Sequence, residues 1–136
     1  MMASPPLVPV LVATAAIFIV GWLWYSPLLF LKPWMRLRGL DPAAAMGGKM
    51  PMGRVGVELV RCFLVSWLVA HLVVNNELHH VTSAIHSGIF YWFTFPVMVF
   101  VGQVTWENVN WKVAAINAGD WLVKLILVPL IIVVMQ

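Results

Sequence analysis

Three polar residues interrupt a long apolar stretch near the C-terminus, and their types and spacing make them the first candidates for chemistry. Asn117, Asp120 and Lys124 are three and four residues apart, so on a helix their side chains lie on one face. The apolar stretch covers residues 113–135, which is long enough to cross a bilayer core of about 30 Å. Opposite charges near the middle of a membrane span are costly unless they are paired and shielded from lipid. These residues therefore predict a buried polar network inside a membrane protein.

Polar residues in two other apolar stretches are predicted to join this network. Glu58 and Arg61 lie in the second stretch and Gln103 lies in the third. With Asp120 and Lys124 the network holds two acidic and two basic residues, so it can neutralise itself. Arg61 and Asp120 lie at similar depths when counted from the ends of their stretches. We expect Asp120 to pair with Arg61, because a guanidinium can bind a carboxylate through two hydrogen bonds.

The network has two interpretations from sequence. It could be a proton or ion relay, or a binding point for a polar substrate, since ionisable groups inside membranes commonly serve such roles. It could equally hold the helices together without passing anything, because polar contacts between membrane helices stabilise packing.

The composition indicates that the solvent of this chain is lipid. Of its 136 residues, 62% are hydrophobic and only 10% are charged, which is more apolar surface than a soluble domain of this size can cover. The net charge of +3 is too small to indicate a nucleic-acid partner. The single cysteine, Cys62, excludes a disulfide within the chain.

The apolar stretches predict one all-α domain, a transmembrane four-helix bundle over residues 1–136. The predicted spans cover residues 7–30, 55–75, 81–106 and 113–135. Pro96 predicts a kink in the third span. Small residues, among them Ala118 and Gly119, lie on the side of the fourth span away from Asp120, so this helix should be central to the bundle or lie at a subunit contact.

The basic residues predict a single orientation in a bacterial inner membrane. The linker over residues 31–54 has one acidic residue and five basic ones, Lys32, Arg36, Arg38, Lys49 and Arg54. The connection over residues 76–81 has Glu77 and no lysine or arginine. By the positive-inside rule the linker is cytoplasmic and both termini are outside. Its stretch 42–52, rich in glycine and proline, should be the loosest part.

Aromatic and basic residues on the linker side are predicted to contact lipid head groups. Trp106 and Trp111 belong to this aromatic belt. The predicted lipid-interface residues are Trp22, Trp24, Tyr25, Lys32, Trp34, Arg36 and Arg38.

Histidines form a second possible site on the opposite side. His71 lies one turn before the end of the second span and His86 about one turn after the start of the third, so they could face each other as haem or metal ligands. They could also be ordinary hydrogen-bonding residues at the membrane interface. No nucleophile–base pattern, phosphate loop or cofactor motif is recognisable, so we expect neither an enzyme nor a bound cofactor.

Two segments resemble a known family. These are Gly21-Trp-Leu-Trp-Tyr-Ser-Pro-Leu28 with Lys32-Pro-Trp-Met35, and Trp111-Lys112 leading into Ile116-Asn-Ala-Gly119. They are similar to domain-of-unknown-function family 1761, a group of small bacterial and fungal membrane proteins. The next residues here are Asp120-Trp121, where the family tends to have Tyr-His. The resemblance implies a four-span fold in a membrane and no known reaction.

Three functions are consistent with these features. The first is an accessory or scaffold subunit that binds membrane lipids, other membrane proteins or further copies of itself. The second is a small oligomeric transporter or proton-coupled carrier that uses Asp120 and Lys124. The third is a haem or metal protein that uses His71 and His86.

The orientation can be tested by labelling single cysteines. Cysteines placed at Arg38 and at His79 should react with a membrane-impermeant reagent from opposite sides, because the five-to-one charge bias assigns the linker to the cytoplasm. Labelling of both positions from the same side would overturn the predicted topology.

Overall fold

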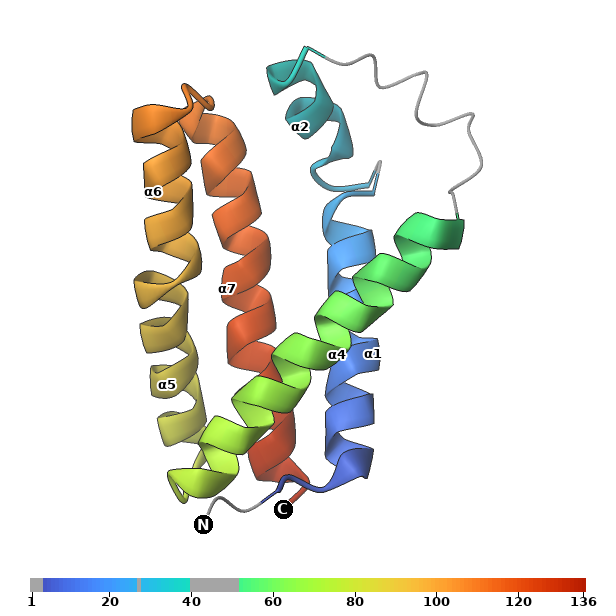
Figure 1. Ribbon diagram of the computed structural model, residues 1–136, viewed down its shortest axis with the longest axis vertical. Coiled ribbons are helices and arrows are strands. Elements are labelled where there is room, and N and C mark those ends of the chain that lie inside the picture. The colour runs from blue at the N-terminus through green and yellow to red at the C-terminus, as the bar shows by residue number, and fades with distance from the viewer. Residues whose placement is uncertain (1–3, 27, 40–51) are drawn as a thin grey trace.

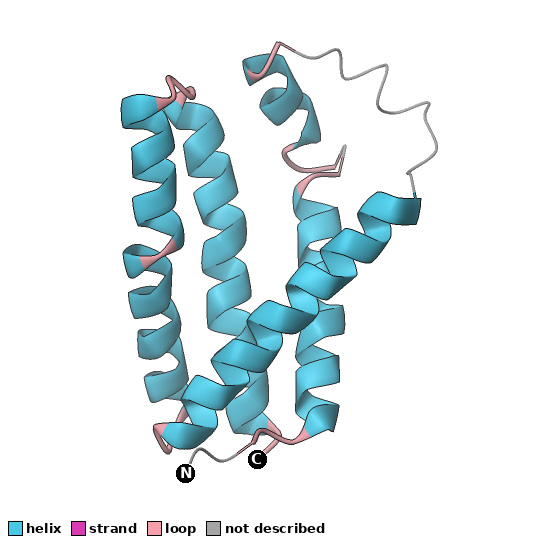
Figure 2. Cartoon of the chain, viewed as in Figure 1, coloured by secondary structure: helices cyan, strands magenta, loops and turns pink. Residues whose placement is uncertain are grey.

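The helices of this protein match the number of spans predicted from its apolar stretches. The structure, a computed structural model, describes residues 4–26, 28–39 and 52–136, and these residues contain helices and no strands (Figure 2). In chain order the helices are α1 (Leu7–Trp24), α2 (Leu31–Leu37), α4 (Met52–Asn75), α5 (Val81–Thr94), α6 (Pro96–Trp106) and α7 (Trp111–Val134) (Figure 1). Four stretches are long and apolar enough to cross a membrane, with α5 and α6 together forming the third. The transmembrane four-helix bundle is confirmed.

The third span is broken where its proline predicts a kink. Helix α5 ends at Thr94 and α6 begins at Pro96, with Phe95 between them at φ −111° and ψ −77° (Figure 2). Proline has no N–H group for the helical hydrogen bond and its ring crowds the preceding turn. The hydroxyl of Thr94 donates to the carbonyl of Phe90 at 2.7 Å, so this side chain is satisfied inside the apolar span.

Helix α7 is the centre of the bundle. It packs against α1, α2, α4, α5 and α6, as the small residues of its sequence predict. The side chain of Asn110 caps its first turn by accepting a hydrogen bond from the backbone N–H of Lys112 at 2.9 Å. Asn108, at φ 56°, supplies the left-handed residue of the short turn that brings α6 back to α7.

The apolar core lies toward the end of the bundle where the chain termini meet. Val10 and Ile17 of α1, Val73 of α4, and Val128 and Ile132 of α7 are at most 1% exposed and belong to one cluster. Helix α4 crosses the others obliquely, so its N-terminal end diverges from α6 and α7 (Figure 1). The bundle is therefore closed at the end with the termini and open toward the end with α2.

A glycine and a proline determine how closely α5 approaches α7. Pro129 lies inside α7 and has no N–H group, so the carbonyl of Leu125, four residues earlier, lacks its usual helical donor. Gly88 of α5 lies over this carbonyl, because a Cβ atom at Gly88 would be 2.3 Å from the oxygen of Leu125. The approach allows a Cα–H group to contact the oxygen, a weak interaction seen between closely packed helices.

Three details differ from the sequence prediction or fall outside the description. The first span ends at Trp24 rather than residue 30, because the chain turns after it. The linker contains a helix, α2. The sequence predicted only that residues of this segment contact lipid head groups. The prediction of a loose stretch over residues 42–52 concerns residues outside the description, apart from Met52, which begins α4.

Replacing Gly88 by alanine should destabilise the bundle. The added methyl group must displace the backbone of α7, and such overpacking costs about 1–3 kcal/mol. Gly102→Ala is the matched control, because nothing lies within 4 Å of a Cβ atom there. Thermal unfolding in detergent should show a lower midpoint for Gly88→Ala only. Equal midpoints for the two variants would contradict the close approach of α5 and α7.

Candidate functional site: a charged pocket in the open half of the bundle

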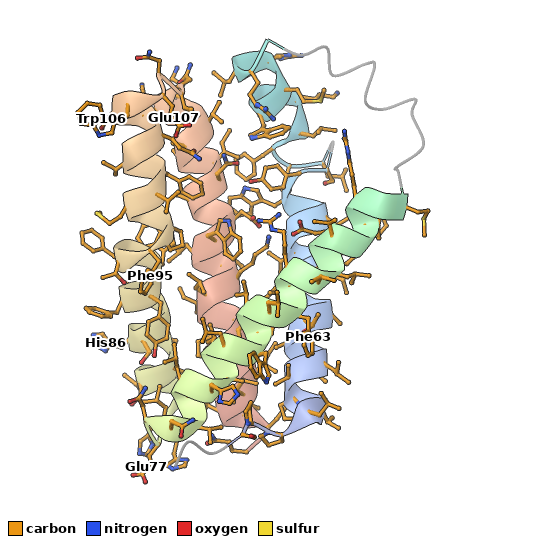
Figure 3. All side chains as sticks on the ribbon, in the orientation of Figure 1. Phe63, Glu77, His86, Phe95, Trp106 and Glu107 are labelled. Carbon is orange, nitrogen blue, oxygen red and sulfur yellow. The ribbon has the colours of Figure 1, made fainter. Side chains whose placement is uncertain are left out.

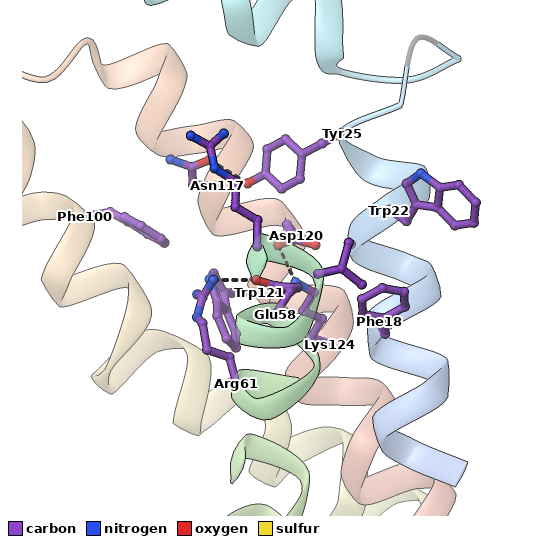
Figure 4. A pocket seen from close by; sticks show the side chains of 13 residues that line it. Phe18, Trp22, Tyr25, Glu58, Arg61, Phe100, Asn117, Asp120, Trp121 and Lys124 are labelled. Atoms are coloured by element: carbon purple, nitrogen blue, oxygen red, sulfur yellow. Dashed lines mark hydrogen bonds and ion pairs between the residues drawn. The ribbon is translucent and has the colours of Figure 1, made fainter. Parts of the chain in front are cut away.

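A large cavity of the described structure lies where α4 diverges from its neighbours. It has a volume of about 710 Å³ and is lined by residues of α1, α4, α6 and α7 (Figure 4). Its apolar lining includes Phe18, Trp22, Phe100 and Trp121. Its polar lining consists of Tyr25, Arg54, Glu58, Arg61, Asn117, Asp120 and Lys124. The pocket thus contains five of the six residues predicted to form the polar network.

Asp120 and Lys124 form a buried ion pair on α7. The Nζ of Lys124 lies 2.8 Å from Oδ2 of Asp120, and the two residues are only 3% and 2% exposed. Gly21 of α1 makes room for the ammonium group, because a Cβ atom there would lie 3.0 Å from Nζ. The same Nζ lies 4.9 Å from the ring centre of Trp121. Asp120 is therefore paired within the bundle, as predicted.

The prediction that Asp120 pairs with Arg61 was wrong. Arg61 pairs instead with Glu58 one turn earlier on α4, at 2.7 Å between Nη1 and Oε2. Lys124 lies one turn from Asp120 on the same helix, so the buried pair forms without help from α4. The side chain of Arg61 is 55% exposed and that of Glu58 is 35% exposed, so this pair lies on the pocket wall. The network consists of two separate pairs, each within one helix (Figure 4).

Asn117 is held by two aromatic donors from the N-terminal part of the chain. The hydroxyl of Tyr25, just beyond α1, donates to Oδ1 of Asn117 at 2.6 Å, and the indole N–H of Trp34, on α2, donates to the same atom at 3.1 Å. Burial raises the pKa of the Tyr25 phenol above its ordinary value, so the hydroxyl keeps its proton and remains a donor. The two rings also contact each other edge to face, with centroids 5.3 Å apart.

A third aromatic donor joins the same two parts of the chain. The indole N–H of Trp24 donates to the carbonyl of Ile116 at 2.9 Å. Gly119 leaves space for this ring, since a Cβ atom there would lie 2.7 Å from the indole. The aromatic segment after residue 21 and the segment 116–119 therefore meet in space. Sequence reasoning missed this contact, because it assigned Trp24, Tyr25 and Trp34 to the lipid interface.

Most of the other predicted residues lie outside the pocket. Gln103 does not line it, although it lies on α6. Lys32, Arg36 and Arg38 are exposed on α2, and Arg38 stacks over Trp34 at 4.5 Å. Trp22, which is 64% exposed, is the one predicted interface tryptophan that both lines the pocket and reaches the surface.

The two histidines do not face each other. The ring of His71 packs edge-on against Trp67 on its own helix, with centroids 4.7 Å apart. His86 is exposed on α5 and points away from the other helices (Figure 3). Among the described residues no group of three or more histidine, cysteine, aspartate or glutamate side chains could hold a metal ion.

The buried pair can be tested with a double-mutant cycle. Asp120→Asn and Lys124→Met should each lower the unfolding midpoint, because breaking a buried pair by removing one partner costs up to about 3–5 kcal/mol. The double variant should lose clearly less than the sum, since neither charge is then left alone. A second cycle with Asp120→Asn and Arg61→Gln should show much smaller coupling. Larger coupling to Arg61 than to Lys124 would restore the original prediction.

Comparison with known proteins agrees with the resemblance noted in the sequence. No curated protein and no solved structure matches the chain. The family model described as a protein of unknown function, DUF1761, matches residues 8–133. This match covers all four spans and both segments that meet at Asn117. The chain therefore belongs to the DUF1761 family.

Proposed function

We propose that this protein is a membrane-embedded binding protein for an amphiphilic molecule, a lipid or a lipid-like compound, which it takes into the pocket between α1, α4, α6 and α7. The observation that carries the proposal is the composition of that pocket, in which aromatic side chains and paired charges line one cavity of about 710 Å³. Binding sites for small molecules typically have volumes of about 300–1,000 Å³.

The two kinds of lining residue correspond to the two parts of an amphiphile. Phe18, Phe100 and Trp121 offer apolar surface to a hydrocarbon chain. Charged and amide groups offer partners to a polar head group, which in a membrane needs hydrogen bonds as much as the protein does. A purely apolar lipid would leave the Arg54 guanidinium and the NH₂ group of Asn117 without a partner, and a purely polar solute would leave the aromatic side chains without an apolar contact.

The proposal is for binding rather than for a reaction. None of the described residues that line the pocket is a serine, threonine, cysteine or histidine, the usual nucleophiles and bases of covalent catalysis. Both acidic groups of the lining are instead committed to ion pairs, Glu58 with Arg61 and Asp120 with Lys124.

We further propose that the same protein has an accessory role in a bacterial inner membrane, with α2 on the cytoplasmic side, and its outer surface supports the accessory role. In the most apolar 18-residue stretch of the α5–α6 span only 11% is buried inside the chain, against 39% in the corresponding stretch of α7. This span exposes large apolar side chains, including Phe90 and Phe93, which can contact lipid, a second copy or another membrane protein.

A carrier is the second candidate, and the buried pair of Asp120 and Lys124 favours it. These charges lie roughly 14 and 20 Å along α7 from Trp111, close to the middle of a helix of about 36 Å. Ionisable pairs at that depth are characteristic of substrate pathways. Proton-dependent flux of an amphiphile between the two leaflets of liposomes would distinguish a carrier from a binding protein.

The binding proposal can be tested by photo-crosslinking. Protein in phosphatidylcholine nanodiscs is irradiated with diazirine analogues of a fatty alcohol and a fatty acid, and the labelled residues are mapped by mass spectrometry. Labelling should concentrate on pocket residues such as Phe18 and Trp121 rather than on Phe90, which is exposed on α5.

A variant with a filled pocket provides the control. Val55→Trp places a large ring in the pocket and should lower pocket labelling by about tenfold or more, because bulk in a packed site excludes the ligand. Val57→Trp is the matched control, since Val57 is 61% exposed on the same helix and does not line the pocket. Labelling spread evenly over the lipid-facing surface, or unchanged in Val55→Trp, would contradict the proposal.

A further inference from the structure

We propose that the head group bound in this pocket is anionic, and that the amide nitrogen of Asn117 and the guanidinium of Arg54 hold it. This inference rests on the proposed binding of an amphiphile and adds the chemical class of the ligand, a single-chain or double-chain amphiphile whose head group carries a carboxylate or phosphate oxygen.

The first step is the orientation of the Asn117 amide. An indole N–H can only donate a hydrogen bond, so the Asn117 atom that Trp34 contacts at 3.1 Å must be the oxygen. The hydroxyl of Tyr25 donates to that same oxygen at 2.6 Å. The NH₂ group of Asn117 therefore points away from both rings, and neither of its N–H bonds has an acceptor among the described residues. Asn117 presents an oriented, unused donor on the pocket wall.

The second step is that the Arg54 guanidinium has no partner among the described residues. Arg54 lies on α4, lines the same pocket, and makes no ion pair or hydrogen bond with any described residue. The other two cations of the pocket, Arg61 and Lys124, are each within 2.8 Å of a carboxylate oxygen. Arg54 is thus the one cation of the pocket lining whose charge is not offset within the described chain.

The third step is the charge of the pocket as a whole. Its lining has three basic residues and two acidic residues, so it carries one excess positive charge. A ligand with a single negative charge neutralises that excess, whereas a cationic head group would double it. Charge neutrality is strongly favoured here because attraction and repulsion are less screened near a low-dielectric membrane than in water.

The fourth step is depth. Arg54 lies two residues into α4, roughly 3 Å from its start, and Asn117 lies six residues into α7, roughly 9 Å from its start. The long arginine side chain can cover this difference. Both donors therefore lie nearer to the helix ends on the α2 side of the pocket than Arg61 and Lys124, which lie nine and thirteen residues into α4 and α7. A head group held by Asn117 and Arg54 leaves its hydrocarbon chain directed toward the aromatic wall.

The experiment uses competition against the photoreactive fatty alcohol in phosphatidylcholine nanodiscs. The competitors are oleate, oleyl phosphate, oleyl alcohol and oleylamine, measured at about pH 9, well above the ordinary carboxyl pKa of about 4. At least one anion should compete about tenfold better than oleyl alcohol, since charge-assisted hydrogen bonds contribute more than neutral ones. Oleate and oleyl phosphate together distinguish a carboxylate from a phosphate ligand, and oleylamine should be the weakest competitor.

The variants assign the preference to residues. Asn117→Asp keeps an oxygen acceptor for Tyr25 and Trp34 but replaces the NH₂ donor, so the preference for the anion over the alcohol should disappear. Arg54→Gln should reduce the same preference about tenfold. Arg38→Gln is the matched control, because Arg38 is exposed on α2 and stacks over Trp34 without lining the pocket. Competition by oleyl alcohol should be unchanged in Arg38→Gln, and the unfolding midpoint of each variant in detergent reports whether the protein is still folded.

The outcomes separate this inference from the proposed function. Equal competition by anions and alcohol, or an anion preference that survives both Asn117→Asp and Arg54→Gln, would overturn the anionic assignment while leaving amphiphile binding intact. An equal loss in Arg38→Gln would mean that general surface charge, and not the pocket, attracts the anion. Failure of every competitor and of the photoreactive alcohol to reach the pocket would overturn the proposed function itself.

Discussion

The structure depends on the need to bury an acidic and a basic side chain inside a membrane span. Asp120 and Lys124 can pair along one helix, but the pair still has to be kept from lipid on every side. Placing α7 at the centre of the bundle meets this need, since α1, α2, α4, α5 and α6 all pack against it and Gly21 of α1 lies against Lys124. The arrangement is not complete in hydrogen bonding, because Oδ1 of Asp120 is buried without a donor among the described residues. The helix that carries the buried ion pair is thus the one most enclosed by protein.

Aromatic residues at the end of α1 and on α2 donate hydrogen bonds to α7, in addition to any contact with the membrane surface. Indole and phenol donors from Trp24, Tyr25 and Trp34 all reach segment 116–119 of α7. Two of these bonds converge on one amide oxygen, which leaves its nitrogen oriented. Because both segments lie within the family match, these contacts give a physical explanation for the residues by which the chain resembles its family.

The spans, the broken third helix and the central position of α7 follow from the sequence because they depend on local properties. Apolar length predicts a span, Pro96 predicts a break, and small residues predict close packing. The partner of Asp120 could not be predicted in the same way, since equal depth on two helices says nothing about their rotation or tilt. Helix α4 crosses obliquely, and Arg61 consequently lies beside Glu58 and not beside Asp120. The role of Tyr25 and Trp34 depends on a contact between residues more than eighty positions apart, which no local pattern reveals.

The unequal packing of the two ends has a mechanical consequence. Helix α4 is anchored through Val73 at the closed end, while Arg54 lies at its far end beside the pocket. Because α4 is about 36 Å long, a rotation of only about 5° around the anchored end displaces the other end by roughly 3 Å. In such a rotation the end of α4 beside the pocket moves most, and the end held in the packed core moves least. A tilt of α4 about this end would therefore change the width of the pocket while moving the core residues nearest to Val73 least.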